Sequence, residues 1–382
     1  MTVNIGIMEL FADVELIHSE ATLALRANAN VTIFTSLMGY ERVSPFFETR
    51  LNDCHWVIKP EKDSLSRFLT KVERYCDEKI DLLFLNTFYV LPHQQLLYYF
   101  FRPKCTTVQV ACRVESWFGE LQPIRNKSAK TFILSVLHNI SQLIRWRTLP
   151  HFNGLWVENR DAYDYAVSKG YKKSLTCNPL LFYTQKKNYQ SYNEKLKCIT
   201  IGTINDQRRD YDGLLDCFEK LFDSGMKNVS LTLLGAPVDD AGLRIINRCD
   251  NLIEKGLDLN YYTEYVHEEI VSQKIASADI IINPNKLGLY GTGTFGAIIK
   301  AMQFAKPGIY PINSLHHKNL ASSSLFYHKI EELSGIIESL LNSPQKIERL
   351  SKNARENSEK FSLERVSKEF QTCVLEKYLT GL

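Results

Sequence analysis

The chain has 382 residues, of which 45% are hydrophobic and 23% are charged. This length exceeds that of one compact domain and suits two domains of ordinary size. The formal net charge of +3 is mild and gives no case for nucleic-acid binding.

Nine cysteines are scattered along the chain without a CxxC pair. The spacing therefore indicates neither a zinc site nor a redox motif, and reduced thiols fit a cytoplasmic protein. The N-terminus lacks the basic start and cleavage site of a signal peptide. No apolar run reaches the roughly 18 residues that a membrane-spanning helix needs. We expect a soluble protein that is at most peripheral to a membrane.

The first part of the chain alternates short apolar strands with helices. Strands are predicted at 3–8, 31–35, 81–86, 107–111, 155–158 and 173–178, and helices at 14–26 and 161–169. Strands without polar alternation, separated by helices, predict a parallel doubly wound sheet. Residues 1–180 should form one Rossmann-like domain.

A polar stretch at 181–196 lacks apolar periodicity and is predicted to be a hinge. The alternation then restarts, with strands at 198–202, 231–235, 260–265, 280–283 and 308–310 and helices at 212–222, 239–255, 268–276 and 297–304. Residues 197–360 should form a second Rossmann-like domain. Parallel α/β sheets bind ligands beyond the carboxyl ends of their strands, so we expect both domains to face a cleft.

The stretch from Ile275 to Pro311 has the sequence expected of a phosphate site. A short apolar strand ends at Pro284, a loop with four glycines follows, and a helix begins near Ala297. Glycines let backbone N–H groups approach a phosphate closely, and the helix N-terminus adds partial positive charge. The alternative is a tight strand-to-helix turn that binds no ligand.

Four segments carry a resemblance to a known family: ITIGTINDQRRDYDGLLDCFEKL, YTEYVHEEIVSQKIASADIIINP, GTGTFGAIIKAM and LWVENRDAYDYAVSKGYKK. Together they resemble retaining glycosyltransferases of the GT-B fold, most closely family four. The resemblance implies an acceptor in the first domain and a nucleotide-diphosphate sugar in the second. It also implies that a C-terminal helix, within 361–382, returns to the first domain.

The resemblance places donor-binding residues at positions that match the family's loops. They are Thr203, Arg208, Arg209, Val266, His267, Gly291, Thr292, Gly293, Thr294, Phe295, Gly296 and Lys300. The sequence departs from the family at its Glu-x7-Glu motif, whose two positions fall on Thr292 and Lys300. We interpret Lys300 as a phosphate contact that replaces a ribose-holding carboxylate; the alternative is a solvated helix residue.

Catalytic residues are harder to place, because the family's histidine in the first domain has no counterpart. His18 and Glu115 are candidates for orienting an acceptor hydroxyl, although a lone histidine is more often structural. A departing phosphate can itself take the acceptor proton, so a general base is not required. No DxD motif or His cluster with acidic support predicts a metal, and Asp239 is expected to cap a helix instead.

Residues 125–147 (RNKSAKTFILSVLHNISQLIRWR) predict a basic amphipathic helix with no acidic residue. Phe132, Val136, Ile140 and Leu143 fall on one stripe, which Ile133, Leu137 and Ile144 widen. Such a helix can lie on the anionic inner face of a membrane, where a lipid-linked acceptor would be found. The alternative is a helix packed into the first domain's core with a basic outer rim.

These observations predict a metal-independent glycosyltransferase that uses a nucleotide sugar and no other cofactor. Its acceptor is expected to be a glycan or lipid-linked sugar in surface-glycan or polysaccharide synthesis. The main alternative is a transferase-like protein without catalysis that serves as a partner or glycan-binding subunit. An epimerase acting on sugar phosphates is a third class that the same double-domain scaffold allows.

Overall fold

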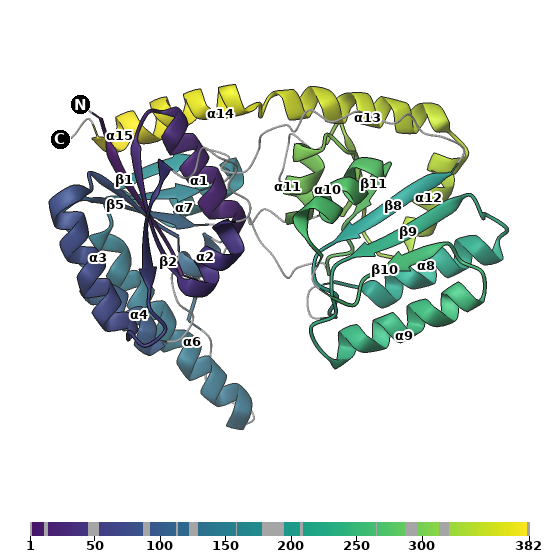
Figure 1. The fold of residues 1–382 in the computed structure, drawn as a ribbon. Coiled ribbons are helices and arrows are strands. Elements are labelled where there is room, and N and C mark those ends of the chain that lie inside the picture. The colour runs from purple at the N-terminus through teal and green to yellow at the C-terminus, as the bar shows by residue number, and fades with distance from the viewer. Residues whose placement is uncertain are drawn as a thin grey trace. The chain divides into compact units, whose positions relative to one another are not determined.

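The computed structural model describes residues 2–10, 14–44, 53–86, 92–111, 114–121, 129–157, 159–177, 195–206, 209–264, 266–286, 296–312 and 321–379. The chain divides into two compact units (Figure 1). The first combines residues 1–181 with residues 364–382, and the second comprises residues 182–363.

The first unit is built on a seven-stranded parallel sheet in the order β3-β2-β1-β4-β5-β6-β7. Its elements are β1 (Asn4–Glu9), α1 (Val14–Arg26), β2 (Asn30–Ser36), α2 (Leu37–Val43), β3 (His55–Lys59), α3 (Leu65–Lys79), β4 (Leu82–Leu85), α4 (Pro92–Phe100), β5 (Thr106–Ala111), α5 (Glu115–Phe118), α6 (Ala129–Thr148), β6 (Gly154–Val157), α7 (Arg160–Ser168) and β7 (Ser174–Cys177).

The central strands of this sheet are buried on both faces, as parallel strands between helical layers require. All four residues of β4 and of β6 are buried. β1 pairs with β2 on one side, where Ile5 lies opposite Val31, and with β4 on the other, where Ile5 lies opposite Leu82. The strand order therefore reverses between β1 and β4, which makes their carboxyl ends the switch point of this sheet.

The end of the chain completes the core of the first unit. Helix α14 (Leu363–Phe370) continues through a π-helical turn at Gln371–Leu375 into α15 (Glu376–Leu379). The Phe370 ring is fully buried, with its centroid 6.0 Å from that of Phe84 and 5.7 Å from that of Trp156. Farther on, the Tyr378 hydroxyl lies 3.2 Å from the Leu155 carbonyl, to which it donates, and accepts from the Thr176 hydroxyl at 3.1 Å.

The second unit has a six-stranded parallel sheet in the order β10-β9-β8-β11-β12-β13. Its elements are β8 (Leu196–Ile201), α8 (Tyr211–Asp223), β9 (Val229–Leu234), α9 (Asp240–Glu254), β10 (Leu259–Tyr261), α10 (Glu268–Ser277), β11 (Ile280–Ile282), α11 (Gly296–Gln303), β12 (Gly308–Pro311), β13 (Ser324–Tyr327), α12 (Glu332–Leu341) and α13 (Pro344–Glu359). Apolar residues of α8, α9 and α12 pack on one face of this sheet, and the order reverses between β8 and β11.

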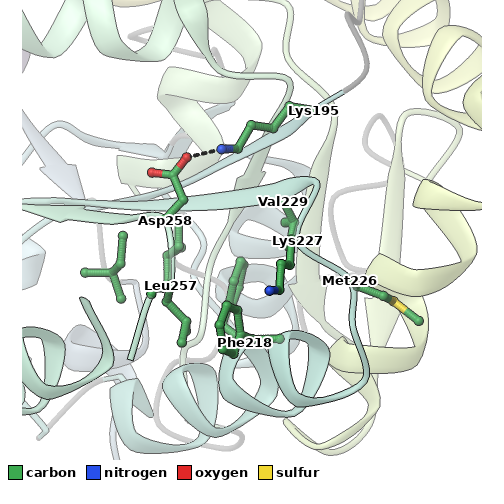
Figure 2. A pocket seen from close by; sticks show the side chains of 11 residues that line it. Lys195, Phe218, Met226, Lys227, Val229, Leu257 and Asp258 are labelled. Atoms are coloured by element: carbon green, nitrogen blue, oxygen red, sulfur yellow. Dashed lines mark ion pairs between the residues drawn. The ribbon is translucent and has the colours of Figure 1, made fainter. Parts of the chain in front are cut away.

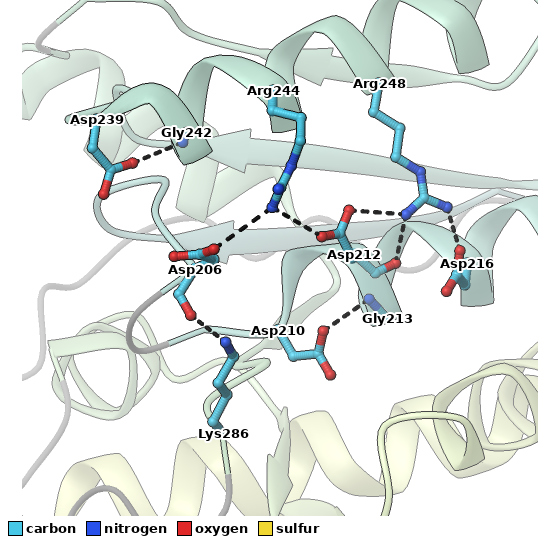
Figure 3. A network of polar contacts seen from close by, with 10 residues as sticks. All are labelled: Asp206, Asp210, Asp212, Gly213, Asp216, Asp239, Gly242, Arg244, Arg248 and Lys286. Atoms are coloured by element: carbon cyan, nitrogen blue, oxygen red, sulfur yellow. Dashed lines mark hydrogen bonds and ion pairs between the residues drawn. The ribbon is translucent and has the colours of Figure 1, made fainter.

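Helices α8 and α9 are capped and joined by polar contacts (Figure 3). The Asp239 carboxylate accepts from the Gly242 amide at 2.8 Å, which confirms the predicted cap of α9. Arg248 of α9 donates to the Asp212 carboxylate at 3.1 Å and forms an ion pair with Asp216 of α8. Half-exposed pairs of this kind add little stability singly, but a shared arginine fixes how the two helices pack.

The predicted fold class is confirmed, because both sheets are parallel and doubly wound. Two strands, β3 and β13, were not predicted from the sequence. Both are edge strands, and β3 buries only one of its five residues, so its sequence HWVIK lacks the apolar run that marks a central strand. Within the described ranges no helix is long and apolar enough to cross a membrane.

Candidate functional site

The switch point of the second sheet carries the residues best suited to an anionic ligand. Here β8 and β11 are neighbours, and the loops that follow them lie beyond their carboxyl ends. Gly202, the first residue after β8, has φ +110°, a backbone conformation that L side chains rarely adopt. A Cβ at this position would lie 2.5 Å from Nη2 of Arg209. Glycine is therefore required for the arginine to lie across the strand end.

Arg209 is held against this loop by hydrogen bonds. Its Nη1 donates to the Thr203 carbonyl at 2.8 Å. The Tyr211 hydroxyl lies 3.2 Å from the carbonyls of both Gly202 and Thr203, so it can donate to either. Burial raises the pKa of Tyr211 to about 12, and the adjacent guanidinium acts against that rise. The first turn of α8 and the arginine thus fix the same loop.

The loop after β11 is joined to the loop after β8. Arg209 and Asn285 form an antiparallel β-bridge, and the Asp210 amide donates to the Pro284 carbonyl at 2.7 Å. Lys286 Nζ donates to the Asp206 carbonyl (Figure 3). These contacts hold the two loops together across the switch point.

Polar atoms of two side chains at this point are buried without hydrogen-bond partners among the described residues. Arg209 Nε has no hydrogen-bond partner among the residues that the structure describes, and neither do Oδ1 and Nδ2 of Asn283. Asn283 directly follows β11 and is only 1% exposed. Leaving such groups unpaired costs about 1–3 kcal/mol each, so their presence favours a site that receives a polar ligand or water. The sequence prediction missed Asn283, although a polar residue ending the run Ile280–Ile282 was a usable signal.

The structure describes only some of the predicted donor-binding residues. Arg208 and the glycine-rich positions Gly291, Thr292, Gly293, Thr294 and Phe295 lie outside the described residues. Gly296 begins α11, and a Cβ there would meet no atom of the described residues within 4 Å. Thr203 is exposed and contributes its carbonyl to the Arg209 loop. Half-buried Val266 and exposed His267 precede α10, and His267 occupies its N-cap position without a side-chain cap.

Lys300 lies in the middle of α11 and is only 8% exposed. The alternative that Lys300 is a solvated helix residue is therefore wrong. Lys306, at the other end of the same βα unit, is turned away from the switch point. Its Nζ donates to the carbonyls of Ala276 and Ala278 at 2.7 and 2.6 Å, and burial lowers its pKa to about 8.

In the first unit, His18 lies on α1 and Glu115 begins α5, both partly buried. These helices follow β1 and β5 at the carboxyl edge of the sheet. A pair that was not predicted lies at the switch point itself: Asn86, just after β4, donates to Oε2 of the fully buried Glu20 at 2.6 Å. An asparagine ending the run DLLFLN was the available sequence signal. Asn86 is half-buried and its Oδ1 has no hydrogen-bond partner among the described residues, so Asn86 is the member of this pair that is a candidate for contacting an acceptor.

The apolar stripe predicted for 125–147 lies on α6, whose described part begins at Ala129. Phe132, Ile140 and Leu143 are 43–47% exposed. The interpretation of a helix packed by its apolar stripe into the core is therefore wrong. Arg125 and Lys127 lie outside the described residues.

Two other features bear on ligand binding. A small pocket of about 130 Å³ lies at the amino edge of the second sheet, where Lys195 forms an ion pair with Asp258 (Figure 2). It lies at the edge opposite the switch point and is too small for a nucleotide. Over the described ranges, no group of three or more His, Cys, Asp or Glu residues could hold a metal ion.

Comparisons with known proteins gave structural matches only. No family model matches the chain, and no curated protein matches its sequence. Sucrose-phosphate synthase from Thermosynechococcus elongatus superimposes with a TM-score of 0.66 at 14% identity, over 99% of both chains. Anabaena HepE in complex with UDP and glucose gives 0.67 at 12% identity, over 98% of this chain and 100% of that one.

A putative UDP-N-acetylglucosamine 2-epimerase from Listeria monocytogenes gives a TM-score of 0.61 at 8% identity, over 98% of this chain and 96% of that one. The fold is GT-B. At these identities the likeness extends to architecture and not to activity.

Proposed function

We propose that this protein is a glycosyltransferase that binds a nucleotide-diphosphate sugar at the switch point of its second sheet. The observation that carries the proposal is Arg209, which is held across the end of β8 with its Nε buried and unpaired within the described chain. A guanidinium can neutralise a leaving diphosphate in place of a metal ion. HepE, which shares the fold, was solved with UDP-glucose, so UDP sugars are the first donors to test.

The reaction fits transfer with retention, as the sequence resemblance implies. The bond between the anomeric carbon and the donor phosphate oxygen breaks, and a bond to the acceptor oxygen forms on the same face of the sugar. The acceptor hydroxyl proton passes to the departing phosphate, whose charge Arg209 stabilises. Lys300, buried on α11, would add positive charge from that helix. No step in this scheme calls for a metal.

We propose a glycan or lipid-linked sugar as acceptor, handled by the first unit on the cytoplasmic side of a membrane. Half-buried Asn86, which donates to the buried Glu20 carboxylate, supports an acceptor site there, because side-chain amides bind sugar hydroxyls. His18 on α1 and Glu115 at the start of α5 follow β1 and β5 at the same edge of the sheet. A role in surface-glycan or polysaccharide synthesis is consistent with such an acceptor.

Replacing Arg209 tests the donor site directly. We expect Arg209→Ala to weaken binding of the preferred nucleotide diphosphate by about 10- to 100-fold, the loss that corresponds to about 1.5–3 kcal/mol for a hydrogen bond to a charged group. Calorimetric titration with a panel of nucleotide diphosphates and their sugars measures it. Arg244→Ala is the matched control, because Arg244 is 63% exposed and bonds only to Asp206 and Asp212 among the contacts seen. Unchanged affinity in Arg209→Ala refutes the proposed donor site.

One observation favours a second function, that of a partner or glycan-binding subunit without catalysis. The position matching the second glutamate of the family's motif is Lys300, whose burial shows that it is built into α11. Hydrolysis or transfer measured over the same panel separates the two functions. Binding without turnover of any donor supports the subunit, whereas Arg209-dependent turnover supports the enzyme. Inversion at the sugar's second carbon, detected in the products, would instead indicate an epimerase.

A further inference from the structure

Helix α6 of the first unit packs on its domain through polar residues and exposes large apolar ones. At 100° per residue, its buried polar residues fall on one side and most of its exposed large apolar residues on the other, while Leu134 (57% exposed) lies on the first side near the N-terminal end. The side packed on the domain carries Ser135, Ser141, Gln142 and Thr148, all at most 8% exposed. The opposite side, called here the α6 apolar face, is 40–57% exposed and consists of Phe132, Ile133, Leu137, Ile140, Leu143 and Trp146.

Hydrogen bonds fix this rotation of the helix. Ser141 donates to Gln95 Oε1 of α4 at 2.9 Å, and both groups are buried. Gln142 donates to the Trp117 carbonyl at 3.1 Å, and Arg145 donates to the Ser116 carbonyl at 2.9 Å. Turning the apolar face inward would break these bonds and leave buried polar groups unpaired, at about 1–3 kcal/mol each. The exposed apolar face is therefore part of the native packing.

Other apolar side chains of the first unit are exposed as well. Helix α4, which packs beside α6, exposes Leu96 at 44% and Phe100 at 66%. At the other end, Trp146 lines a pocket of about 440 Å³ together with Phe118 and Tyr171. An apolar surface of this extent on a single unit is more than scattered surface residues account for.

Positive charge predominates around the face, although Lys169 forms an ion pair with the exposed Glu120 at 3.8 Å. The sequence of α6 contains no acidic residue, and Arg147 is exposed beside Ile140 and Leu143 on the same side. Lys169, Lys172 and Lys173 lie on the pocket, whose lining contains no carboxylate. Lys173 Nζ is turned to the carbonyls of Pro150 and Phe152, whereas Lys172 is exposed. Basic residues flanking an apolar face, with tryptophan at its end, match the interface of an anionic bilayer.

We infer that the α6 apolar face docks the protein on a membrane that carries anionic phospholipids. The apolar side chains would enter the boundary between headgroups and acyl chains, and Arg147 and Lys172 would contact lipid phosphates. The pocket beside Trp146 would receive part of a headgroup or the start of a chain. This inference goes beyond sugar transfer and does not depend on it, because none of these residues belongs to the donor site.

Vesicle co-sedimentation of the full chain tests the inference. Vesicles of phosphatidylcholine with phosphatidylglycerol should bind the protein, and vesicles of phosphatidylcholine alone should bind it less. Binding should weaken between about 0.1 M and about 1 M salt, because the Debye length falls from about 10 to about 3 Å. The triple variant I133Q/L137Q/I140Q should lose at least about tenfold in partitioning, and Lys172→Glu should lose the preference for anionic vesicles.

Matched controls keep the outcome interpretable. The double variant V238Q/L243Q removes two exposed apolar side chains (59% and 53% exposed) from the second unit and should bind vesicles like wild type. Lys352→Glu, on α13, is the charge control. If the protein binds vesicles neither at the low nor at the high salt concentration, the inference is overturned. So does conversion of a wild-type dimer to a monomer by the triple variant without an effect on vesicles, which would make the face an interface between copies. Nucleotide affinity should be unchanged in the triple variant, so failure here leaves the proposed function standing.

Discussion

Gly202→Ala is the sharpest test of how the second unit positions Arg209. Gly202 has φ +110°, and an added Cβ would lie 2.5 Å from Nη2, 3.0 Å from Cζ and 3.1 Å from Nη1 of Arg209. Contacts this close cannot persist, so the guanidinium must move away from the end of β8. The substitution therefore combines backbone strain with displacement of a proposed ligand-binding group.

The two effects have separable magnitudes. A residue other than glycine in this backbone region costs about 1–3 kcal/mol. Displacing Arg209 also breaks its exposed 2.8 Å hydrogen bond to the Thr203 carbonyl, which adds about 0.5–1.5 kcal/mol. Gly225→Ala is the matched control, because Gly225 has φ +82° in the same unit and a Cβ there would meet no atom within 4 Å. We expect Gly225→Ala to show the strain alone.

Urea unfolding of both variants, followed by circular dichroism, measures the difference in stability. Calorimetric titration with the preferred nucleotide diphosphate measures the effect on the site. Gly202→Ala should be the less stable of the two by about 0.5–1.5 kcal/mol, and it alone should lose nucleotide affinity. Equal destabilisation together with equal, wild-type affinity would refute the assigned role of Gly202.

Two further predictions concern the core of each unit. Phe370→Ala removes a fully buried ring and should lower the stability of the first unit by about 3–5 kcal/mol. All four tryptophans lie between positions 56 and 156, so tryptophan fluorescence isolates this transition, and an unshifted midpoint would contradict the packing. Burial, with the charge of Asp250, raises the pKa of Cys249 from 9.0 to about 12. Because the folded pKa is raised, this stability is fully present below pH 9 and is lost between pH 9 and about pH 12, at about 1.4 kcal/mol per pH unit. Cys249→Ala should flatten this alkaline loss, measured by thermal melts, and exposed Cys373→Ala should not.

The parallel sheets were predictable because their central strands are continuous apolar runs such as Ile280–Ile282. The edge strand β3 was not, because a strand with one buried residue has no period to detect. The position of Arg209 in the loop after β8 made it a predicted site residue. Nothing in the neighbouring sequence showed that the Arg209 side chain lies where a Cβ on residue 202 would be. Both this contact and the burial of Asn283 depend on how segments pack in the folded chain, which the local sequence does not determine.

The orientation of helix α6 was likewise not predictable from its own sequence. Its sequence identified the apolar stripe correctly and could not say which side would pack on the domain. The decision depends on Gln95 and the Trp117 carbonyl, which lie 46 and 25 residues away from their partners on α6. The spacing of apolar residues shows which of them share one face of the helix. The polar partners that decide which face packs on the domain come from distant segments.

The return of the C-terminal helix to the first unit has a consequence for biosynthesis. Residues 1–181 leave the ribosome before the second unit is made, yet Phe84 and Trp156 receive the Phe370 ring only when the last segment appears. At about 5–20 residues per second, the nascent first unit waits roughly 10–40 s with this apolar surface uncovered. A premature stop just after residue 363 would therefore leave the second unit whole and the first one open to chaperones and proteases.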